Sequence, residues 1–428
     1  MIKNILNKKI AVLGFGREGK SILKFLKKSV RYKNAIISVL DKKSDKNYLK
    51  NLNDFDEVYR SPGVPYNLLE IQKAIKKGVR FKSATTLFFE EARKIGCKII
   101  GITGTKGKGT TSTLLYKILR ASGKNVYLAG NIGKPAIDIL PYLNKNSVVI
   151  LELSSFQLQD LRYSPDIAAV LDVFEDHLDS HKNFKEYLNA KISISEFQHS
   201  SNKIFYFSDN KYSKLIAEHG FAEKIAVSTD NFNLFKPKEL KMAGHHNFKN
   251  AVMATMIAKN LGIKEEIIKK VVRNFRGLEH RLEFVREINN VKLYNDSAST
   301  NPYTAVAAIE AFSEPKILIA GGKDKNLDYS PLKNALKKSN VKLVILFGEN
   351  KQKIAKTIFR SRNKELRIMN VNNLETAVKK AYIAAKSIIH NSYFIIHIIF
   401  SPASASFDMF KDYQDRGKKF KELVKKLK

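Results

Sequence analysis

A glycine-rich run from Gly101 to Thr111 has the composition and spacing of a phosphate-binding loop. Glycines let backbone N–H groups curl around phosphate oxygens, and a helix that follows adds the positive end of its dipole. Lys108 stands where its ammonium can reach the β and γ phosphates of a nucleotide. The usual motif places Ser or Thr directly after the lysine to bind Mg²⁺, but Gly109 follows here, so Thr110 or Thr111 must supply the hydroxyl. The residues expected around the phosphates are Gly104, Thr105, Lys106, Gly107, Lys108, Gly109, Thr110 and Thr111.

Acidic and imidazole side chains follow the next two buried strands that the sequence predicts. Residues 148–151 form an apolar run that ends on Glu152, and residues 167–171 lead into a segment that contains Asp176 and His177. The carboxyl ends of parallel strands lie along one edge of a sheet, so these groups should lie beside the phosphate loop. Glu152 stands where a second Mg²⁺ ligand belongs, and His177 belongs to an oxygen and imidazole cluster next to the phosphates.

A second glycine pattern opens the chain. Gly14, Gly16 and Gly19 are followed about 20 residues later by Asp41, as in a dinucleotide fingerprint. This pattern predicts a glycine cradle, a backbone loop that binds a pyrophosphate. Such a loop can bind the diphosphate of a UDP-sugar as well as that of NAD. Because the chain has a separate ATP loop, the pattern favours a UDP-linked substrate over NAD.

The elements that must hold these loops are alternating strands and helices, which predict βαβ units and parallel sheets. We expect three α/β domains: a Rossmann-like domain over residues 1–93, a central P-loop ATPase-type domain with a parallel sheet over 94–277, and a C-terminal Rossmann-like α/β domain over 278–428. The last domain should begin with a hairpin whose turn is Asn289-Asn290.

Composition narrows the class of protein further. The chain has 428 residues and a single cysteine, Cys97, so an internal disulfide is excluded and a reducing cytoplasm is the expected compartment. No apolar stretch approaches the roughly 20 residues of a membrane-spanning helix, and no secretory signal opens the sequence. The net charge of +35 comes mostly from lysines spread over the whole length, which predicts no specific nucleic-acid site.

Taken together, these motifs resemble the UDP-N-acetylmuramoyl-L-alanine:D-glutamate ligases of the Mur ligase superfamily, and the match runs end to end. The segments that carry it are the two glycine loops, Ser61-Pro62-Gly63, 130–133, 152–157, 175–177, Ala190-Lys191, His246-Asn247, Asn250, 277–281, 295–297, 321–325 and 401–408. The resemblance implies a two-step reaction. ATP phosphorylates the alanyl carboxylate of the UDP-muramoyl substrate, and the amine of D-glutamate attacks the acyl phosphate to form an amide.

The resemblance also implies roles for particular residues. The UDP moiety would contact Arg17, Glu18, Asp41 and Gly63, and the muramoyl part Asn131. Mg²⁺ would be held by Thr110, Glu152, His177 and Lys191, the last as a carbamate. The nucleotide would be clasped by Asn247, Asn250, Arg281 and Asp296. D-Glutamate would meet Thr300, Lys325, Ser406, Phe407 and Tyr413. The catalytic groups would be Lys108, His177 and Lys191, and an unmodified Lys191 is expected to be an exposed helical lysine. We expect a monomer.

Two positions depart from the family pattern. Gly109 is typical of folylpolyglutamate synthases, and Ala298 stands where some family members have a lysine, which puts one substrate contact in question. One alternative is a folylpolyglutamate-type ligase, but such an enzyme lacks the separate glycine cradle at the start. A second is a P-loop ATPase that binds nucleic acid, which predicts a groove of interleaved basic and aromatic residues. A third is an NAD-dependent dehydrogenase, which leaves the P-loop without a purpose.

Overall fold

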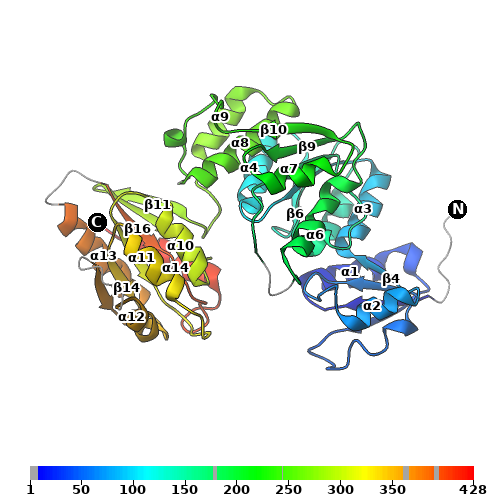
Figure 1. Ribbon diagram of the computed structural model, residues 1–428, viewed down its shortest axis with the longest axis horizontal. Helices are drawn as coiled ribbons and strands as arrows, with labels where there is room; N and C mark the ends of the chain where they lie inside the picture. The colour runs from blue at the N-terminus through cyan, green and yellow to red at the C-terminus, as the bar shows by residue number, and fades with distance from the viewer. Residues whose placement is uncertain (1–7, 177–180, 243, 360–365, 390–394) are drawn as a thin grey trace. The chain divides into compact units, whose positions relative to one another are not determined.

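The computed structural model describes residues 8–176, 181–242, 244–359, 366–389 and 395–428. The chain forms two compact units (Figure 1). Unit 1 comprises Met1–Phe235 and Lys249–Val272, and unit 2 comprises Lys236–Phe248 and Arg273–Lys428. The predicted α/β class with parallel sheets is confirmed, because each unit is built from parallel strands and helices. The division into three domains stays a prediction. Its boundary at residue 93 falls inside the helix Ala84–Ile95.

The first sheet of unit 1 has four parallel strands in the order β2-β1-β3-β4. Its elements are β1 (Lys9–Leu13), α1 (Arg17–Lys28), β2 (Ile36–Leu40), β3 (Glu57–Arg60), α2 (Leu69–Lys76), β4 (Arg80–Ser83) and α3 (Ala84–Ile95), with short 3-10 turns at Val30–Tyr32 and Leu52–Asp54. Side chains alternate between the two faces of a strand. Ile10 and Val12 of β1 accordingly enter one core cluster with α1 and α3, while Ala11 and Leu13 enter another with α2. Both faces of the sheet are therefore covered by helices.

The second sheet of unit 1 has six parallel strands in the order β10-β9-β8-β5-β7-β6. Its elements are β5 (Lys98–Thr103), α4 (Lys108–Ala121), β6 (Val126–Gly130), β7 (Val148–Glu152), α5 (Ser155–Leu158), β8 (Ile167–Val170), α6 (Phe184–Glu196), β9 (Lys203–Phe207), α7 (Lys211–Glu218) and β10 (Glu223–Val227), with a 3-10 turn η3 at Ala136–Tyr142. Because β5 lies between β7 and β8, the segments that leave these three strands meet at one edge.

Unit 2 contains a six-stranded sheet in the order β11-β12-β16-β13-β14-β15. Its elements are β11 (Glu283–Ile288), β12 (Val291–Asn295), α10 (Pro302–Glu310), β13 (Lys316–Ala320), α11 (Ser330–Lys338), β14 (Val341–Leu346), α12 (Lys351–Phe359), β15 (Arg367–Asn370), α13 (Leu374–Ile389), β16 (Ile396–Phe400) and α14 (Tyr413–Lys425). The predicted hairpin is confirmed: β11 and β12 pair antiparallel, and Asn289 and Asn290 take left-handed φ values of 48° and 62°. The other strand pairs are parallel.

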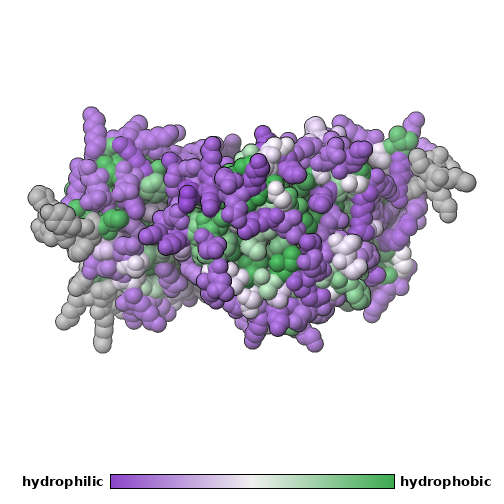
Figure 2. All heavy atoms as spheres, turned by 90° about the horizontal axis from the view of Figure 1, so that it is seen from above, coloured by the Kyte–Doolittle hydropathy of each residue, from purple (hydrophilic) through white to green (hydrophobic). Residues whose placement is uncertain are grey.

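The helix α8 (His245–Asn260) begins with residues that belong to unit 2 and continues with residues that belong to unit 1, and α9 (Glu265–Asn274) follows it. A short 3-10 turn at Pro237–Glu239 precedes it. Within the described part of the chain, no helix is long and apolar enough to cross a membrane. Figure 2 shows charged and polar side chains over most of the visible face, with apolar patches between them.

Candidate active site

The phosphate loop forms the sharp connection between β5 and α4, as the glycine pattern predicts. Gly104 has φ 148°, and a Cβ there would lie 2.7 Å from the Leu171 side chain. Gly107 has φ 84° at the N-cap of α4, and a Cβ there would lie 2.2 Å from Asn250 Oδ1. Both positions require glycine, because the backbone is left-handed and a neighbouring residue fills the space a side chain would need. The loop is thus shaped by its own glycines and by α8.

Thr105 fastens the loop to the segment that leaves β8. Its backbone N–H donates to the Asp172 carbonyl at 2.8 Å, and its hydroxyl donates to the Phe174 carbonyl at 3.0 Å. The Tyr187 hydroxyl of α6 lies 2.9 Å from the Thr105 hydroxyl oxygen. Thr105 is 6% exposed, so both its N–H and its side chain hold the loop against this segment. Nearby, the Lys106 ammonium lies over the Phe174 ring at 5.6 Å.

Two lysines from different helices converge on this loop. Lys108 Nζ donates to the carbonyl oxygens of Gly104 and Thr105 at 2.9 and 3.0 Å. Lys191 Nζ, from α6, donates to the same Gly104 carbonyl at 3.0 Å and lies over the Tyr187 ring. Burial, followed by the charge of Lys108, holds the pKa of Lys191 well below its usual range.

The expectation that Lys191 is exposed is wrong, because its side chain is 1% exposed. The helix α6 turns Lys191 inward against the loop, together with the buried residues Tyr187 and Ile194. A charged ammonium would be costly to bury there, because among the described residues no carboxylate is hydrogen-bonded to it.

The two candidate hydroxyls for Mg²⁺ differ in their surroundings. Thr111 is fully buried, and its hydroxyl donates to Asn250 Oδ1 at 3.3 Å. Thr110 is partly exposed in the first turn of α4, directly after Gly109. Because Thr111 is engaged with α8, Thr110 is the better candidate for a ligand on the exposed side of the loop.

Glu152 ends β7 beside the phosphate loop, as predicted, and it is paired with Asn131. Asn131 Nδ2 donates to Glu152 Oε1 at 2.7 Å, and the Asn131 N–H donates to the Glu152 carbonyl at 3.0 Å. Gly130 makes this approach possible: a Cβ there would lie 2.4 Å from the Glu152 carbonyl oxygen. Asn131, proposed to contact the muramoyl part, therefore directly contacts Glu152, which is proposed to bind Mg²⁺.

The donors on this edge fit Mg²⁺ in type. A carboxylate and a threonine hydroxyl are hard oxygen ligands, and Mg²⁺ is usually bound by one or two carboxylates together with phosphates and water. Among the described residues there is no group of three or more His, Cys, Asp or Glu side chains arranged around a metal position. His177, the other predicted ligand, lies outside the described residues.

The glycine cradle of the first sheet is held by side chains that follow two strands, Asp41 after β2 and Ser61 after β3. Phe15 N–H donates to Asp41 Oδ2 at 2.5 Å, and this bond with one from the Lys43 N–H lowers the pKa of Asp41. Ser61 donates from its hydroxyl to the Gly14 carbonyl at 2.6 Å. A Cβ on Gly19 would lie 2.0 Å from the Gly14 carbonyl, so the turn is tight. Asp41 is thus an acceptor for backbone N–H groups of the loop as well as a candidate for the UDP moiety.

The other residues predicted for the UDP moiety line the same cradle. Gly63 lies in an open turn with nothing within 4 Å of a Cβ built on it. Arg17 is exposed at the first turn of α1. Glu18 is partly buried, and Gln157 Nε2 donates to Glu18 Oε1 at 2.7 Å. Burial raises the pKa of Glu18 above its usual value.

Unit 2 places Asp296 and Arg281 close to each other at the start of its sheet. Asp296 Oδ2 accepts from the Ser401 hydroxyl at 2.6 Å, and Oδ1 accepts from the Leu282 N–H at 3.0 Å. Burial raises the pKa of Asp296 to about 7, against the lowering effect of its hydrogen bonds and of Arg281. Of the two predicted asparagines on α8, Asn247 belongs to unit 2 and Asn250 to unit 1.

The residues predicted for D-glutamate come from three loops of unit 2. The Lys325 ammonium lies over the Phe407 ring at 5.4 Å, and Phe407 is itself exposed. Ser406 is buried, and its carbonyl accepts from the Phe410 N–H at 2.9 Å. Tyr413 begins α14 and is partly exposed, and Thr300 follows the hairpin. Lys325 and Phe407 are therefore neighbours, whereas the roles of all five residues stay predictions.

Comparison with known proteins decides the family. The chain matches the Mur ligase middle domain over residues 102–238 and the Mur ligase glutamate ligase domain over residues 280–389. It is 34% identical to a UDP-N-acetylmuramoylalanine–D-glutamate ligase of Acetivibrio thermocellus, with 99% of this chain and 98% of the relative covered. A ligase of the same name from Aquifex aeolicus is 37% identical, with 97% and 98% covered. The chain belongs to the UDP-N-acetylmuramoylalanine–D-glutamate ligase family. It is an ATP-dependent ligase.

Solved structures agree with this ligase in fold. UDP-N-acetylmuramate-alanine ligase MurC of Thermotoga maritima aligns with a TM-score of 0.57 at 17% identity, covering 98% of this chain and 99% of that one. MurF ligase of Thermotoga maritima in complex with ADP aligns with a TM-score of 0.58 at 14% identity, covering 100% and 97%. A folylpolyglutamate synthase of Mycobacterium tuberculosis also shares the fold, with a TM-score of 0.56 at 13% identity, covering 79% and 94%. At such identities the likeness shows the fold alone.

Sequence motifs missed one buried feature of this ligase. Arg60 forms an ion pair with Asp160, at 3.0 Å, in which both side chains are almost fully buried. The two residues are 100 positions apart, and neither belongs to a motif with a known spacing. The only sequence signal is that the charged residue Arg60 stands directly before Ser61-Pro62-Gly63, at the end of a strand that is buried throughout.

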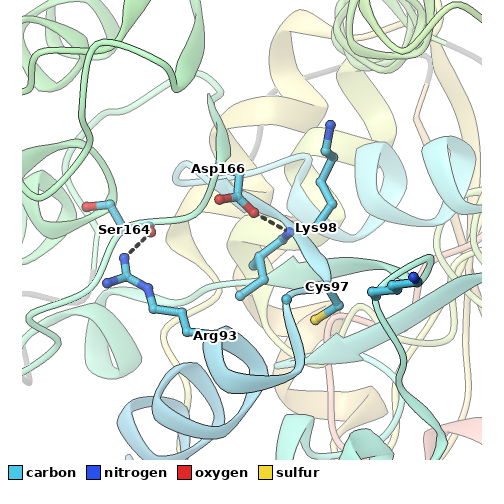
Figure 3. A pocket seen from close by; sticks show the side chains of 8 residues that line it. Arg93, Cys97, Lys98, Ser164 and Asp166 are labelled. Atoms are coloured by element: carbon cyan, nitrogen blue, oxygen red, sulfur yellow. Dashed lines mark hydrogen bonds between the residues drawn. The ribbon is translucent and has the colours of Figure 1, made fainter.

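A pocket of about 310 Å³ lies at the other edge of the central sheet of this ligase. Figure 3 shows Arg93, Cys97 and Asp166 around it, and Asp166 accepts a hydrogen bond from the Ile99 N–H at 2.7 Å. These residues precede or begin β5 and β8, whereas the phosphate loop follows the carboxyl end of β5. The pocket is therefore separate from the proposed active site.

Proposed function

We propose that this ligase uses ATP to join D-glutamate to UDP-N-acetylmuramoyl-L-alanine, the reaction for which its relatives are named. The observation that carries the proposal is the convergence of Lys108 and Lys191 on the Gly104 carbonyl, within a P-loop whose neighbouring strand ends on Glu152. A carboxylate is a poor electrophile, and phosphoryl transfer turns one of its oxygens into a leaving group. A phosphate loop that carries Lys108 suits this activation.

The reaction balances in two steps. In the first, an oxygen of the alanyl carboxylate attacks the γ phosphorus, the bond to the oxygen of ADP breaks, and an acyl phosphate forms. In the second, the neutral amine of D-glutamate attacks the acyl carbon, phosphate leaves, and the nitrogen releases a proton to give the amide. Lys108 offsets the negative charge that would otherwise repel the attacking carboxylate in the first step.

The buried Lys191 supports the carbamate that the family resemblance implies. A lysine whose pKa lies well below its usual range presents a neutral amine, which is the form that reacts with CO₂. The new bond joins Nζ to the CO₂ carbon, and one proton is released. The product is an anion in the place of a neutral amine, so it offers oxygen ligands next to the loop and attracts the Lys108 side chain.

Mg²⁺ would be held by Thr110, Glu152 and the modified Lys191, with His177 as a further ligand outside the described residues. When bound, the ion would supply positive charge that offsets the negative charge developing on the phosphate oxygens during transfer. Asn131 orients Glu152 through its side-chain hydrogen bond, so it links the metal ligand to the substrate that the same asparagine is proposed to contact.

The remaining roles follow the fold. The cradle at Gly14 to Gly19 would hold the UDP diphosphate, together with Arg17, Glu18, Asp41 and Gly63. The loops of unit 2 would supply the nucleotide and D-glutamate contacts. We further propose that the protein acts as a cytoplasmic monomer, that the boundaries near residues 93 and 277 separate three domains, and that nucleic acid binds only through non-specific charge attraction.

Phosphate release tests the proposed function. Purified protein with ATP and Mg²⁺ should release phosphate only when both UDP-N-acetylmuramoyl-L-alanine and D-glutamate are present, and the amide product should appear by mass in equal amount. Omission of either substrate is the matched control. Release with a folate and L-glutamate instead would favour a folylpolyglutamate-type ligase, and release that depends on nucleic acid would favour an ATPase of another class.

A further inference from the structure

Arg60 connects the proposed UDP site to the central sheet of unit 1. It ends β3 directly before the turn of residues 61–64, and its side chain is 1% exposed. The guanidinium donates to the Val64 carbonyl at 2.7 Å and to the Phe156 carbonyl at 3.2 Å. It also donates twice to Asp160 Oδ2, from Nε at 3.1 Å and from Nη2 at 3.0 Å. One side chain therefore holds the turn 61–64 and the short helix α5 together.

The helix α5, which Arg60 contacts, lies close in the chain to the proposed phosphate site. The helix α5 follows β7, whose last residue is Glu152, and Ser154 with Gln157 forms a capping box at its start. Phe156 and Asp160 lie within and just after α5, so Arg60 fixes the segment that leaves the Glu152 strand. A shift of α5 would displace Glu152, because α5 begins at Ser155, only three residues after Glu152 in the chain.

The chemistry of the contact favours a positional role. The fork of five donors on an arginine fixes directions that a lysine cannot reproduce. A buried ion pair is frequently no better for stability than apolar residues of the same volume, so its presence alone does not account for the fold. Burial raises the pKa of Asp160 while Arg60 opposes the rise, and Asp160 Oδ1 is buried without a hydrogen-bond partner among the described residues. Asp160 thus depends on Arg60 for its charge.

Two further contacts run along the same seam. Gln157 of α5 donates to Glu18 in the glycine cradle at 2.7 Å. Asn67, just after the turn 61–64, donates to Glu186 of α6, the helix that carries Lys191. The cradle is consequently tied to α5 and the segment after the turn 61–64 to α6, and the buried pair Arg60–Asp160 adds a third contact between the same parts of unit 1.

We propose that Arg60 is a positioning residue, which sets the place where the alanyl carboxylate of the UDP-linked substrate meets the phosphate loop. The proposal rests on the proposed function. UDP is held by the turn and the cradle, while phosphoryl transfer occurs at the loop and Glu152. A misplacement of about 1 Å between a bound group and its reaction partner can slow a reaction by about a hundredfold. Arg60 touches neither substrate nor nucleotide in this role.

Two variants separate positioning from folding. Arg60→Lys keeps the charge and loses the fork, and the double variant Arg60→Met with Asp160→Leu removes the pair without leaving a buried charge. The matched control is Arg31→Lys, because Arg31 is a partly exposed arginine in the 3-10 turn Val30–Tyr32 of the same unit, and its carboxylate partner, Glu91, lies 3.9 Å away. Kinetic constants for each substrate, binding of UDP alone by calorimetry and the thermal unfolding midpoint are measured for each protein.

We expect kcat to fall about tenfold or more in both Arg60 variants, while the KM for ATP and the Kd for UDP change by no more than about threefold. The control should keep its kcat. An unchanged kcat in a folded Arg60→Lys protein, or a loss of kcat matched by equal loss of UDP and ATP binding, overturns the positioning role. A wild-type protein that shows no release dependent on both substrates overturns the proposed function instead, so the two failures are distinct.

Discussion

Lys108 and Lys191 belong to different helices, yet both donate to the carbonyl oxygen of Gly104, at 2.9 and 3.0 Å. Two ammonium groups on one acceptor repel each other, and Lys191 is the buried member of the pair. Burial, followed by the charge of Lys108, therefore favours the neutral form of Lys191. The same geometry explains why one lysine suits electrostatic work and the other suits modification.

Replacement of Lys191 should separate stability from activity. We expect Lys191→Met to raise the free energy of unfolding by about 1–3 kcal/mol, because methionine fills the space without burying an amine. The same variant should lose ligation, since no carbamate can form. Urea unfolding and the phosphate assay measure the two effects. In Lys191→Ala, short carboxylic acids should restore part of the rate, and unmodified Lys191 in a fully active enzyme, seen by mass, would contradict the idea.

Replacement of Lys108 should affect the rate of chemistry. We expect Lys108→Ala to lower kcat by an amount equal to about 3–4 kcal/mol of transition-state stabilisation, as for the loss of one catalytic donor. Lys117→Ala, at an exposed position on the same helix, is the control and should leave kcat unchanged. Near-wild-type turnover of Lys108→Ala would show that the loop is not the phosphate site.

Asp296 should make the stability of unit 2 depend on pH. Its pKa is raised to about 7 by burial, so the folded state holds a proton that the unfolded chain releases near pH 4. The stabilising contribution of the neutral acid is complete below about pH 4 and is lost as the pH rises through about 7, a change of up to about 4 kcal/mol. Asp296→Asn should flatten this part of the profile. Unfolding measured from pH 4 to 8 in both proteins checks it, and parallel profiles would count against the raised pKa.

The acceptor site should distinguish the two forms of glutamate. Three directions of contact define a stereocentre, so D-glutamate should be used and L-glutamate rejected. Ser406→Ala or Lys325→Ala should raise the KM for D-glutamate roughly tenfold, because a hydrogen bond to a charged group is lost, with little change in the KM for ATP. Competition between amino acids in the ligation assay checks this. Equal use of L-glutamate, or an unaltered KM for D-glutamate in both variants, would place the pocket elsewhere.

Local patterns made most of the fold and part of the site predictable. The phosphate loop and the Asn289-Asn290 turn are determined by neighbouring residues, since glycine and asparagine tolerate left-handed backbone. Burial of Lys191 depends on which face of α6 meets the loop, and the contact between Arg60 and Asp160 joins residues 100 positions apart. Such contacts arise from packing, and neither composition nor helical periodicity reveals them. The site residues therefore stay predictions until variants are measured.

The path of α8 has a consequence for how this protein can be divided. Phe248 and Lys249 are consecutive, but the first belongs to unit 2 and the second to unit 1. A fragment that ends at Phe235 would lack Asn250, the residue against which Gly107 is packed. Neither unit corresponds to one uninterrupted stretch of the gene. Exchange of domains between relatives by a single crossover inside α8 would therefore produce chains with mismatched halves. Intact exchange of unit 1 requires three crossovers, one on either side of residues 236–248 and a third between Val272 and Arg273.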